Sequence, residues 1–239
     1  MSKIAFMFPG QGAQYIGMGK DFYDAVPESR RMFELASEAS GLDVAALCFE
    51  ENENINITEY TQIAMLAAEA AMLKAVEERG IKPDVTAGLS LGEYGALAAS
   101  GVMSEADIFK VVRKRGLYMQ EAVPTGGAMT AVLGLDADVI EKICEETPGI
   151  VSIANYNCPG QIVITGEEAA VSNAAKALAQ AGAKRCVPLK VSGPFHSKLL
   201  TGAGEKLGKV LADVEIREIE VPYLANVTAD YVTDKGQVK

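Results

Sequence analysis

The sequence predicts an α/β protein in which a large domain carries a smaller inserted subdomain. Short apolar runs alternate with longer stretches of helical periodicity along the 239 residues. Residues 85–100 read as a strand, a tight turn and a helix, and residues 125–190 show a different rhythm of strands and helices. With 49% hydrophobic residues, the chain is long enough to bury a substantial core.

The large domain is expected to span residues 1–124 and 191–239. Its strands are predicted at residues 4–8, 85–89 and 221–224, and its helices at residues 27–39, 59–79, 91–100 and 105–123. A last helix is predicted after the segment VSGPFHSKLL and ends near residue 212. Thr58 is a candidate N-cap for the second of these helices, and Gly80 is its C-terminal stop. The segment SEAD, which starts at Ser104, has the spacing of a capping box and opens the fourth helix.

The inserted subdomain is expected to span residues 125–190, after a PTGG hinge. Its strands are predicted at residues 129–133, 150–154, 162–165 and 185–189, and its helices at residues 137–146 and 168–180. The resulting order, β-α-β-β-α-β, is that of a ferredoxin-like fold.

Charge and cysteine content exclude several classes of protein. The net charge of −10 argues against general nucleic-acid binding, which requires a positive surface. Four scattered cysteines without C-x-x-C spacing and a single histidine argue against a metal site, and the cysteines are predicted to be reduced in the cytoplasm. The short apolar start is not typical of a signal peptide, and the longest apolar stretch is too short to span a bilayer.

Ser90 lies in GLSLG, a G-x-S-x-G pattern, at the predicted junction of a strand and a helix. In this context the pattern is typical of a nucleophile elbow, whose backbone N–H groups stabilise an oxyanion. The alternative is a glycine–serine turn that serves only close packing.

A nucleophilic serine also requires a base. His196, the only histidine, follows in the loop SGPFHS at a predicted domain junction, where catalytic residues often lie; an ordinary histidine is the alternative.

Arg115 falls in the middle of an apolar stripe on the helix at residues 105–123. A guanidinium on a buried face requires an anion, either one of the chain's own carboxylates or a substrate carboxylate. Lys110, Arg113 and Lys114 fall outside the stripe and are predicted to be solvated. The glycine-rich loop GQGAQ follows the first strand and lacks nucleotide-binding spacing. Its glycines could let a backbone N–H approach a ligand, and the alternative is an ordinary glycine-rich turn.

Several motifs in order resemble those of the malonyl-CoA:acyl carrier protein transacylases of fatty-acid synthesis and the acyltransferase domains of polyketide synthases. The motifs are FPGQGAQ, GLSLGEY, KRG around Arg115, NYNCPGQIVITG, GPFHS and LANVTA. Together they extend over nearly the whole chain. The resemblance implies an α/β-hydrolase-like large domain with a ferredoxin-like small domain.

The resemblance also implies roles for individual residues. Ser90 would take the malonyl group as an ester, and His196 would act first as general base and then as general acid. The backbone N–H groups of Gln11 and Leu91 would form the oxyanion hole. Arg115 would pair with the free carboxylate of malonate.

Asn155, in the NYN segment, matches a position that lines the active-site region in the family. The implied substrates are malonyl-CoA and acyl carrier protein, with no metal or redox cofactor, no nucleic acid and no membrane as partner, and the implied location is the cytoplasm. Because carrier proteins are acidic, Lys184, Arg185 and Lys190 are candidates for a basic contact surface.

Two features depart from the family pattern. Leu89 stands before the nucleophile, where many members have histidine, and this concerns local packing more than catalysis. Family members usually continue through a further C-terminal segment, so the large domain is expected to be C-terminally truncated. Two alternatives to malonyl transfer remain. One is a serine esterase or thioesterase that uses the same Ser90 elbow, and the other is a catalytically incomplete binding fragment, because the C-terminal segment is missing.

Overall fold

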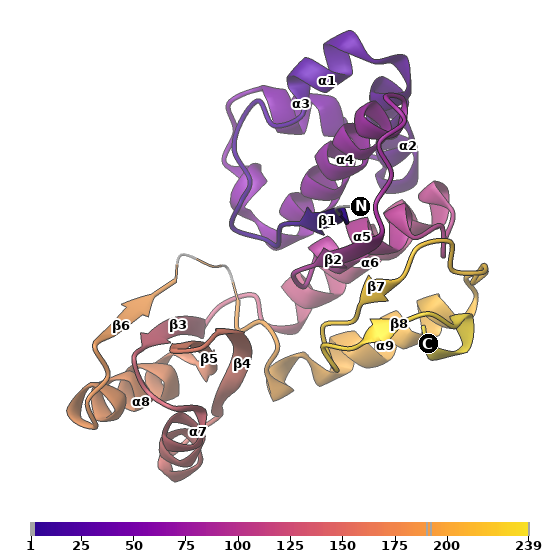
Figure 1. Ribbon diagram of the computed structural model, residues 1–239. Coiled ribbons are helices and arrows are strands. Elements are labelled where there is room, and N and C mark those ends of the chain that lie inside the picture. Colours follow the sequence, from indigo (N-terminus) through magenta and orange to yellow (C-terminus); the bar gives the residue numbers. More distant parts are fainter. Residues whose placement is uncertain (1–2, 190, 192, 239) are drawn as a thin grey trace. The chain divides into compact units, whose positions relative to one another are not determined.

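The structure is a computed structural model that describes residues 3–189, 191 and 193–238 (Figure 1). The chain divides into two compact units. The first consists of Met1–Leu117 and Leu207–Lys239, and the second of Tyr118–Lys206. The predicted subdomain at residues 125–190 lies within the second unit, which extends further at both ends; residue 190 itself is outside the described residues.

The first unit contains a small sheet and most of the helices (Figure 1). Its strands are β1 (Ala5–Phe8), β2 (Val85–Gly88), β7 (Tyr223–Leu224) and β8 (Tyr231–Val232). Its helices are α1 (Lys20–Ala25), α2 (Pro27–Ser40), α3 (Val44–Phe49), α4 (Thr58–Glu77) and α5 (Gly92–Ala99), with most of α6 (Glu105–Ala122) and the second half of α9 (Thr201–Ala212). Single 3₁₀ turns lie at Asn54–Asn56 and Lys235–Gln237.

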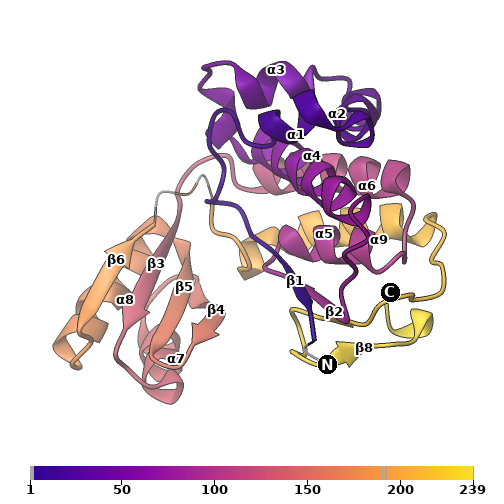
Figure 2. The same ribbon diagram turned by 45° about the horizontal axis from the view of Figure 1, so that its top comes forward.

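The sheet of this unit has the strand order β1-β2-β7-β8. Strands β1, β2 and β7 run parallel to one another, with Ala87 aligned to Met7 on one side and to Leu224 on the other. Strand β8 pairs antiparallel with β7. Figure 2 shows α4 and α5 on one side of β1 and β2. Phe8 is buried on that side, whereas Met7, which alternates with it, is 81% exposed.

Helix α4 forms the centre of the first unit. Fourteen of its residues are buried, so the helix is covered around most of its circumference. Helix α2 packs against it, and the Ser29 hydroxyl donates to the Ala71 carbonyl oxygen at 2.6 Å. The helix begins at Thr58 with Ile57 as its N-cap residue, so the prediction of Thr58 as the cap was wrong by one position.

Two short helices, α1 and α3, were not predicted from the sequence. Each has six residues, fewer than two turns, which is too short to display a helical period. They are held by tertiary contacts instead: Tyr23 of α1, Phe33 of α2 and Phe49 at the end of α3 form an aromatic cluster with ring centroids 5.1 to 5.5 Å apart.

One acidic side chain lies inside this core. Glu69 of α4 is 7% exposed, and neither of its carboxyl oxygens has a hydrogen-bond partner among the described residues. It lies against α5, since a Cβ added at Gly95 would be 2.8 Å from Oε2 of Glu69. Burial raises the pKa of Glu69 to about 8, because the charged form loses its hydration without gaining a partner.

Substitution of Glu69 by glutamine is therefore expected to stabilise the protein in a pH-dependent way. The folded state keeps the Glu69 proton up to a pKa of about 8, whereas the unfolded state releases it near the ordinary value of 4.5. The free energy of unfolding of the wild type should thus fall as the pH rises through this interval. We expect a gain for Glu69→Gln of roughly 2–4 kcal/mol at pH 8 and less than about 1 kcal/mol at pH 5.

Urea denaturation of both proteins between pH 5 and 8.5 measures this difference. A matched control is Glu38→Gln on α2, because Glu38 is exposed and its loss should leave the pH dependence unchanged. A Glu69→Gln protein with the same pH profile as the wild type would contradict the assignment.

The second unit has the predicted ferredoxin-like order of elements. They are β3 (Gly127–Leu133), α7 (Ala137–Glu146), β4 (Val151–Cys158), β5 (Gln161–Glu167), α8 (Glu168–Gln180) and β6 (Arg185–Pro188), followed by a 3₁₀ turn at Lys198–Leu200. The four strands are antiparallel in the order β4-β5-β3-β6 (Figure 2). The prediction of this arrangement from alternating periodicities is confirmed.

The two faces of this second sheet carry different apolar clusters. Val132, Ile162 and Ile164 pack with residues of α7 and α8 on the helical face. Met129, Ala131 and Val163 point to the other face and pack against Phe195, in the loop that follows β6. That loop contains His196, so the sheet serves as its support.

In the described part of the chain, no helix is both long enough and apolar enough to cross a membrane.

Candidate active site

Ser90 occupies a sharp turn between β2 and α5. Its backbone φ is +54°, a left-handed conformation that is uncommon for a residue with a side chain. Glycines on both sides allow this turn: a Cβ at Gly88 would collide with the carbonyl oxygen of Gly92, and a Cβ at Gly92 with that of Phe8. The strand–turn–helix arrangement predicted for the G-x-S-x-G pattern is confirmed, and the glycines are required by close backbone approach.

The loop after β1 packs directly against this turn. The Leu89 N–H donates to the Phe8 carbonyl oxygen at 3.1 Å, and a Cβ at Gly10 would lie 2.7 Å from the Leu89 carbonyl oxygen. The adjacent residue, Gln11, is held by side-chain hydrogen bonds to Thr58 at 3.2 Å and to Gln62 at 3.4 Å, both on α4. The predicted loop at residues 10–14 and the Ser90 elbow are therefore neighbours.

Two backbone donors at this junction are available to a ligand. Within the described residues, no hydrogen-bond acceptor is found for the N–H of Gln11 or for that of Leu91. Leu91 is fully buried and forms the N-terminal boundary of α5, where backbone N–H groups and the helix dipole favour negative charge. These are the two N–H groups that the sequence-based hypothesis assigned to an oxyanion hole.

Arg115 reaches the same place from α6. Its Nη2 donates to the Ser90 hydroxyl oxygen at 3.0 Å, and its guanidinium carbon lies 5.6 Å from the centre of the Tyr94 ring. Burial lowers the pKa of Arg115, while Tyr94 and Glu93 act in the opposite direction. The predicted stripe includes the buried Ile108, and Arg115 on it donates to the Ser90 hydroxyl. Among the described residues, no carboxylate forms an ion pair with Arg115 within 4.0 Å.

The neighbouring cations on α6 differ from one another. Lys110 and Lys114 are exposed, as predicted. The Arg113 side chain is only 15% exposed, so its prediction as a solvated residue was wrong. Its Nη1 donates to the Glu59 carbonyl oxygen at 2.7 Å and lies 3.6 Å from the Glu59 carboxylate. Arg113 therefore ties α6 to α4, which holds the helix that carries Arg115.

The helix start at Ser104 also follows the prediction. Ser104 accepts a hydrogen bond from the Asp107 N–H at 3.1 Å and donates its own hydroxyl to the Asp107 carboxylate at 2.6 Å. This cap stabilises the first turn of α6.

Two further polar residues lie at the elbow, and sequence reasoning did not single them out. The Asn226 side chain accepts a hydrogen bond from the Ser90 N–H at 2.6 Å and donates one to the Gly88 carbonyl oxygen at 2.6 Å. The Glu93 carboxylate accepts from the Asn226 N–H at 3.1 Å. Burial raises the pKa of Glu93, partly offset by Asn226 and Arg115. In the sequence, only the motifs that contain them, GLSLGEY for Glu93 and LANVTA for Asn226, pointed to these two residues.

His196 belongs to the second unit and is presented by a well-anchored loop. Pro194, Phe195 and Ser197 are buried, whereas His196 between them is exposed and has a φ of +60°. The Ser197 hydroxyl donates to the Pro194 carbonyl oxygen at 2.8 Å, and a Cβ at Gly127 would collide with the Pro194 ring. The loop thus holds its histidine in a strained conformation at the surface of its unit.

Backbone strain coincides with the predicted chemistry. Among the residues that the structure describes, three residues other than glycine have a positive φ: Ser90, His196 and Ala229. Such conformations persist only where surrounding contacts enforce them, and they concentrate at functional sites. Two of the three are the residues that the sequence singled out as nucleophile and base.

The remaining predicted residues lie in the second unit. Asn155 on β4 is partly buried and pairs with Val163, whose side chain belongs to the cluster that contains Phe195. Cross-strand partners share a face of the sheet, so Asn155 lies on the face that supports the His196 loop. Lys184 and Arg185 are exposed at the edge of the sheet formed by β6, and Lys190 is outside the described residues.

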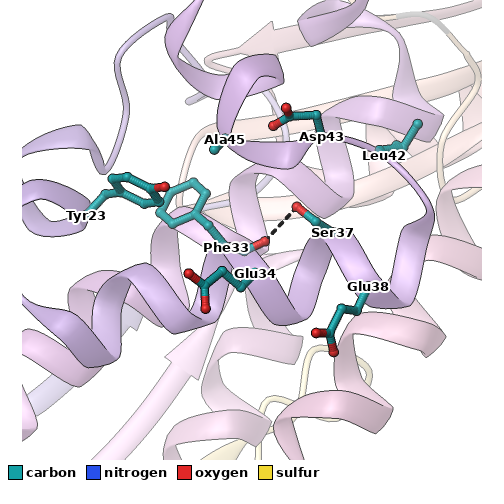
Figure 3. Close-up of a pocket in the computed structure, with 8 residues that line it drawn as sticks. All are labelled: Tyr23, Phe33, Glu34, Ser37, Glu38, Leu42, Asp43 and Ala45. Carbon is teal, nitrogen blue, oxygen red and sulfur yellow. Dashed lines mark hydrogen bonds between the residues drawn. The ribbon is translucent and has the colours of Figure 1, made fainter.

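A cavity of about 470 Å³ lies elsewhere, between α1, α2 and α3 (Figure 3). Its lining residues are Tyr23, Phe33, Glu34, Ser37, Glu38, Leu42, Asp43 and Ala45. Two of its polar groups have structural roles: Ser37 donates to the Phe33 carbonyl oxygen, and Asp43 caps α3 by accepting from the Ala46 N–H at 2.9 Å. None of the predicted site residues lines it, so the candidate active site remains the Ser90 elbow.

The described residues also contain no group of three or more histidine, cysteine, aspartate or glutamate side chains placed to hold a metal ion.

Comparison of the sequence and the structure with known proteins identifies the family of this chain. The acyl transferase domain family matches residues 5–238, nearly the full length. This chain belongs to the acyl transferase family. The malonyl CoA-acyl carrier protein transacylase of Bacillus subtilis (strain 168) is 48% identical to this acyltransferase over 244 residues, which cover 100% of this chain and 77% of the relative.

Two solved structures are similar to the acyltransferase. The crystal structure of MCAT from Streptococcus pneumoniae is 47% identical with a TM-score of 0.93, over 98% of this chain and 77% of that one. A malonyl-transacylase in complex with a type II PKS acyl-carrier protein is 41% identical with a TM-score of 0.94, over 99% of this chain and 78% of that one.

These similarities confirm the family resemblance and the fold class, an α/β-hydrolase-like large domain with a ferredoxin-like subdomain. The chain is an acyltransferase enzyme. Neither a serine esterase nor a catalytically incomplete binding fragment is favoured by them.

Proposed function

We propose that this acyltransferase moves a malonyl group from malonyl-CoA to the phosphopantetheine thiol of acyl carrier protein, in fatty-acid biosynthesis. The observation that carries the proposal is the 3.0 Å hydrogen bond from Arg115 to the Ser90 hydroxyl oxygen. A malonyl ester on Ser90 has a free carboxylate a few bonds away from that oxygen. A guanidinium already at the serine is placed to bind this carboxylate in bidentate geometry.

The proposed reaction has two halves. In the first, His196 takes the Ser90 hydroxyl proton while the oxygen attacks the thioester carbonyl carbon. The N–H groups of Gln11 and Leu91 stabilise the resulting oxyanion, and CoA leaves as a thiol with the proton that His196 returns. In the second half, the carrier-protein thiol attacks the Ser90 ester by the same route, and the serine is released with its proton.

Pairing of Ser90 with His196 is part of the proposal, because the two residues lie in different units. The strained, anchored presentation of each residue supports it. Asn155 is proposed to line the region around the histidine, since it shares the sheet face that supports the His196 loop.

The relatives support the choice of donor and acceptor. The Bacillus subtilis protein is named for malonyl-CoA and acyl carrier protein, and one similar malonyl-transacylase was solved with an acyl-carrier protein. The thioester supplies its own leaving group, so the reaction as written requires no metal or redox cofactor. We place it in the cytoplasm, in keeping with four cysteines that are free thiols.

Intact-mass spectrometry after mixing the protein with malonyl-CoA tests the proposal. One malonyl adduct is expected per chain, mapped to Ser90 by peptide analysis and lost on addition of holo acyl carrier protein. Acetyl-CoA is the matched control, because it lacks the carboxylate that Arg115 would bind, and it should acylate the chain more slowly. Absence of an adduct in a folded chain, or an adduct on a cysteine instead, would count against the proposed function.

A further inference from the structure

Asn226, which lies outside the predicted site, forms a hydrogen bond with the backbone of the nucleophile. It lies 136 positions from Ser90 in the sequence, in the turn between β7 and β8. β7 is the parallel neighbour of β2, and the carboxyl ends of parallel strands lie at the same edge of a sheet. Asn226 stands two residues after β7 and Ser90 two residues after β2, so the sheet brings them together.

The Asn226 side chain spans the elbow from one side to the other. Its Oδ1 accepts from the Ser90 N–H and its Nδ2 donates to the Gly88 carbonyl oxygen, both at 2.6 Å. The orientation of the amide is unambiguous, because a backbone N–H can only donate and a backbone carbonyl can only accept. The two bonds bracket Leu89 and fix the turn at both of its ends.

Asn226 is itself held in place. Its N–H donates to the Glu93 carboxylate at 3.1 Å, and Glu93 is on α5, three residues beyond the nucleophile. The turn is closed by a hydrogen bond from the Ala225 N–H to the Asp230 carbonyl oxygen at 3.1 Å and by one from the Ala229 N–H to the Ala225 carbonyl oxygen at 2.9 Å. The amide therefore acts from a fixed support.

We propose that Asn226 is a positioning residue for acyl transfer, which holds the Ser90 backbone in its left-handed conformation so that the hydroxyl stays at Arg115. Without the amide, the Ser90 N–H and the Gly88 carbonyl oxygen lose partners that enforce an unfavourable φ. The elbow then relaxes, and the hydroxyl moves away from the guanidinium. This inference rests on the proposed function, in which Ser90 is the nucleophile.

Asn226→Ala is expected to lower the rate of Ser90 acylation at saturating malonyl-CoA by roughly 10- to 100-fold, with the KM changed less than about threefold. A displaced nucleophile slows the chemical step, whereas the groups that bind the substrate remain. Asn226→Asp keeps an oxygen that accepts from the Ser90 N–H but not the donor to Gly88, so it should recover part of the rate. Val227→Ala is the matched control, because Val227 is in the same turn and 96% exposed.

Amide hydrogen exchange of Ser90 provides a readout that does not depend on activity. Exchange is expected to be roughly tenfold faster in Asn226→Ala than in the wild type and unchanged in Val227→Ala. Should Asn226→Ala fail to fold, Asn226→Asp serves for both measurements, with a smaller loss of rate expected.

Acylation of a folded Asn226→Ala protein within twofold of the wild type would overturn the inference, as would an equal loss in Val227→Ala. Failure of the wild type to form an adduct would instead refute the proposed function, and the exchange comparison would still decide whether Asn226 holds the elbow.

Discussion

Ser90→Ala is expected to abolish acyl transfer, with a fall in rate of at least about 10⁴-fold. The substitution removes the oxygen that would carry the acyl ester and that accepts the hydrogen bond from Arg115. Alanine and serine meet the same steric limit at a φ of +54°, so the free energy of unfolding should change by less than about 1 kcal/mol.

Mass spectrometry for the malonyl adduct and a steady-state assay with acyl carrier protein measure the effect. Ser40→Ala is the matched control, since Ser40 lies on α2 and its hydroxyl donates only to backbone carbonyl oxygens of its own helix. A Ser90→Ala protein that still forms a stable adduct would refute the assignment of the nucleophile.

Arg115→Ala is expected to lower malonyl transfer by roughly 10²- to 10³-fold and to leave acetyl transfer within about tenfold of its starting rate. The guanidinium is partly buried beside Ser90, so its removal leaves a substrate carboxylate without a partner in a site where hydration is restricted. An acetyl group has no such carboxylate, so the preference for malonyl should shrink or reverse.

Comparing kcat/KM for malonyl-CoA and acetyl-CoA measures this change in preference. Lys114→Ala is the matched control, because Lys114 is the preceding residue on α6 but is exposed. Arg115→Lys should recover only part of the malonyl rate, since an ammonium cannot form the bidentate pair. Equal losses with both substrates would indicate a structural role for Arg115, and no loss would favour an esterase-like site.

The parts of the fold that the sequence predicts best are those with a strong local period or a fixed local motif. The alternating elements at residues 127–188 form the expected sheet, because each strand and helix is long enough to show its own period. The Ser104 cap, the glycines around Ser90 and the apolar stripe that carries Arg115 are also local features. Their structural consequences depend on residues only a few positions away.

The parts that the sequence did not reveal depend on distant partners. The helices α1 and α3 have too few residues for a visible period and are stabilised by an aromatic cluster formed between elements. Arg113 was predicted to be solvated because its own helix places it outside the apolar stripe, but α4 covers it and Glu59 binds it. Nor does any local pattern distinguish Glu69 from an exposed glutamate on an amphipathic helix.

The sequence by itself determined the family and predicted both folds, the α/β-hydrolase-like one and the ferredoxin-like one. It also supplied the candidate site residues Ser90, His196 and Arg115, since motif spacing and periodicity are properties of a linear chain. Only the tertiary structure decided that Arg115 points at Ser90, that the loop containing Gln11 lies against the elbow, and that Asn226 holds the Ser90 backbone. The physical reason is sheet pairing: β1, β2 and β7 are far apart in sequence but adjacent in the sheet, so their carboxyl ends meet at one edge.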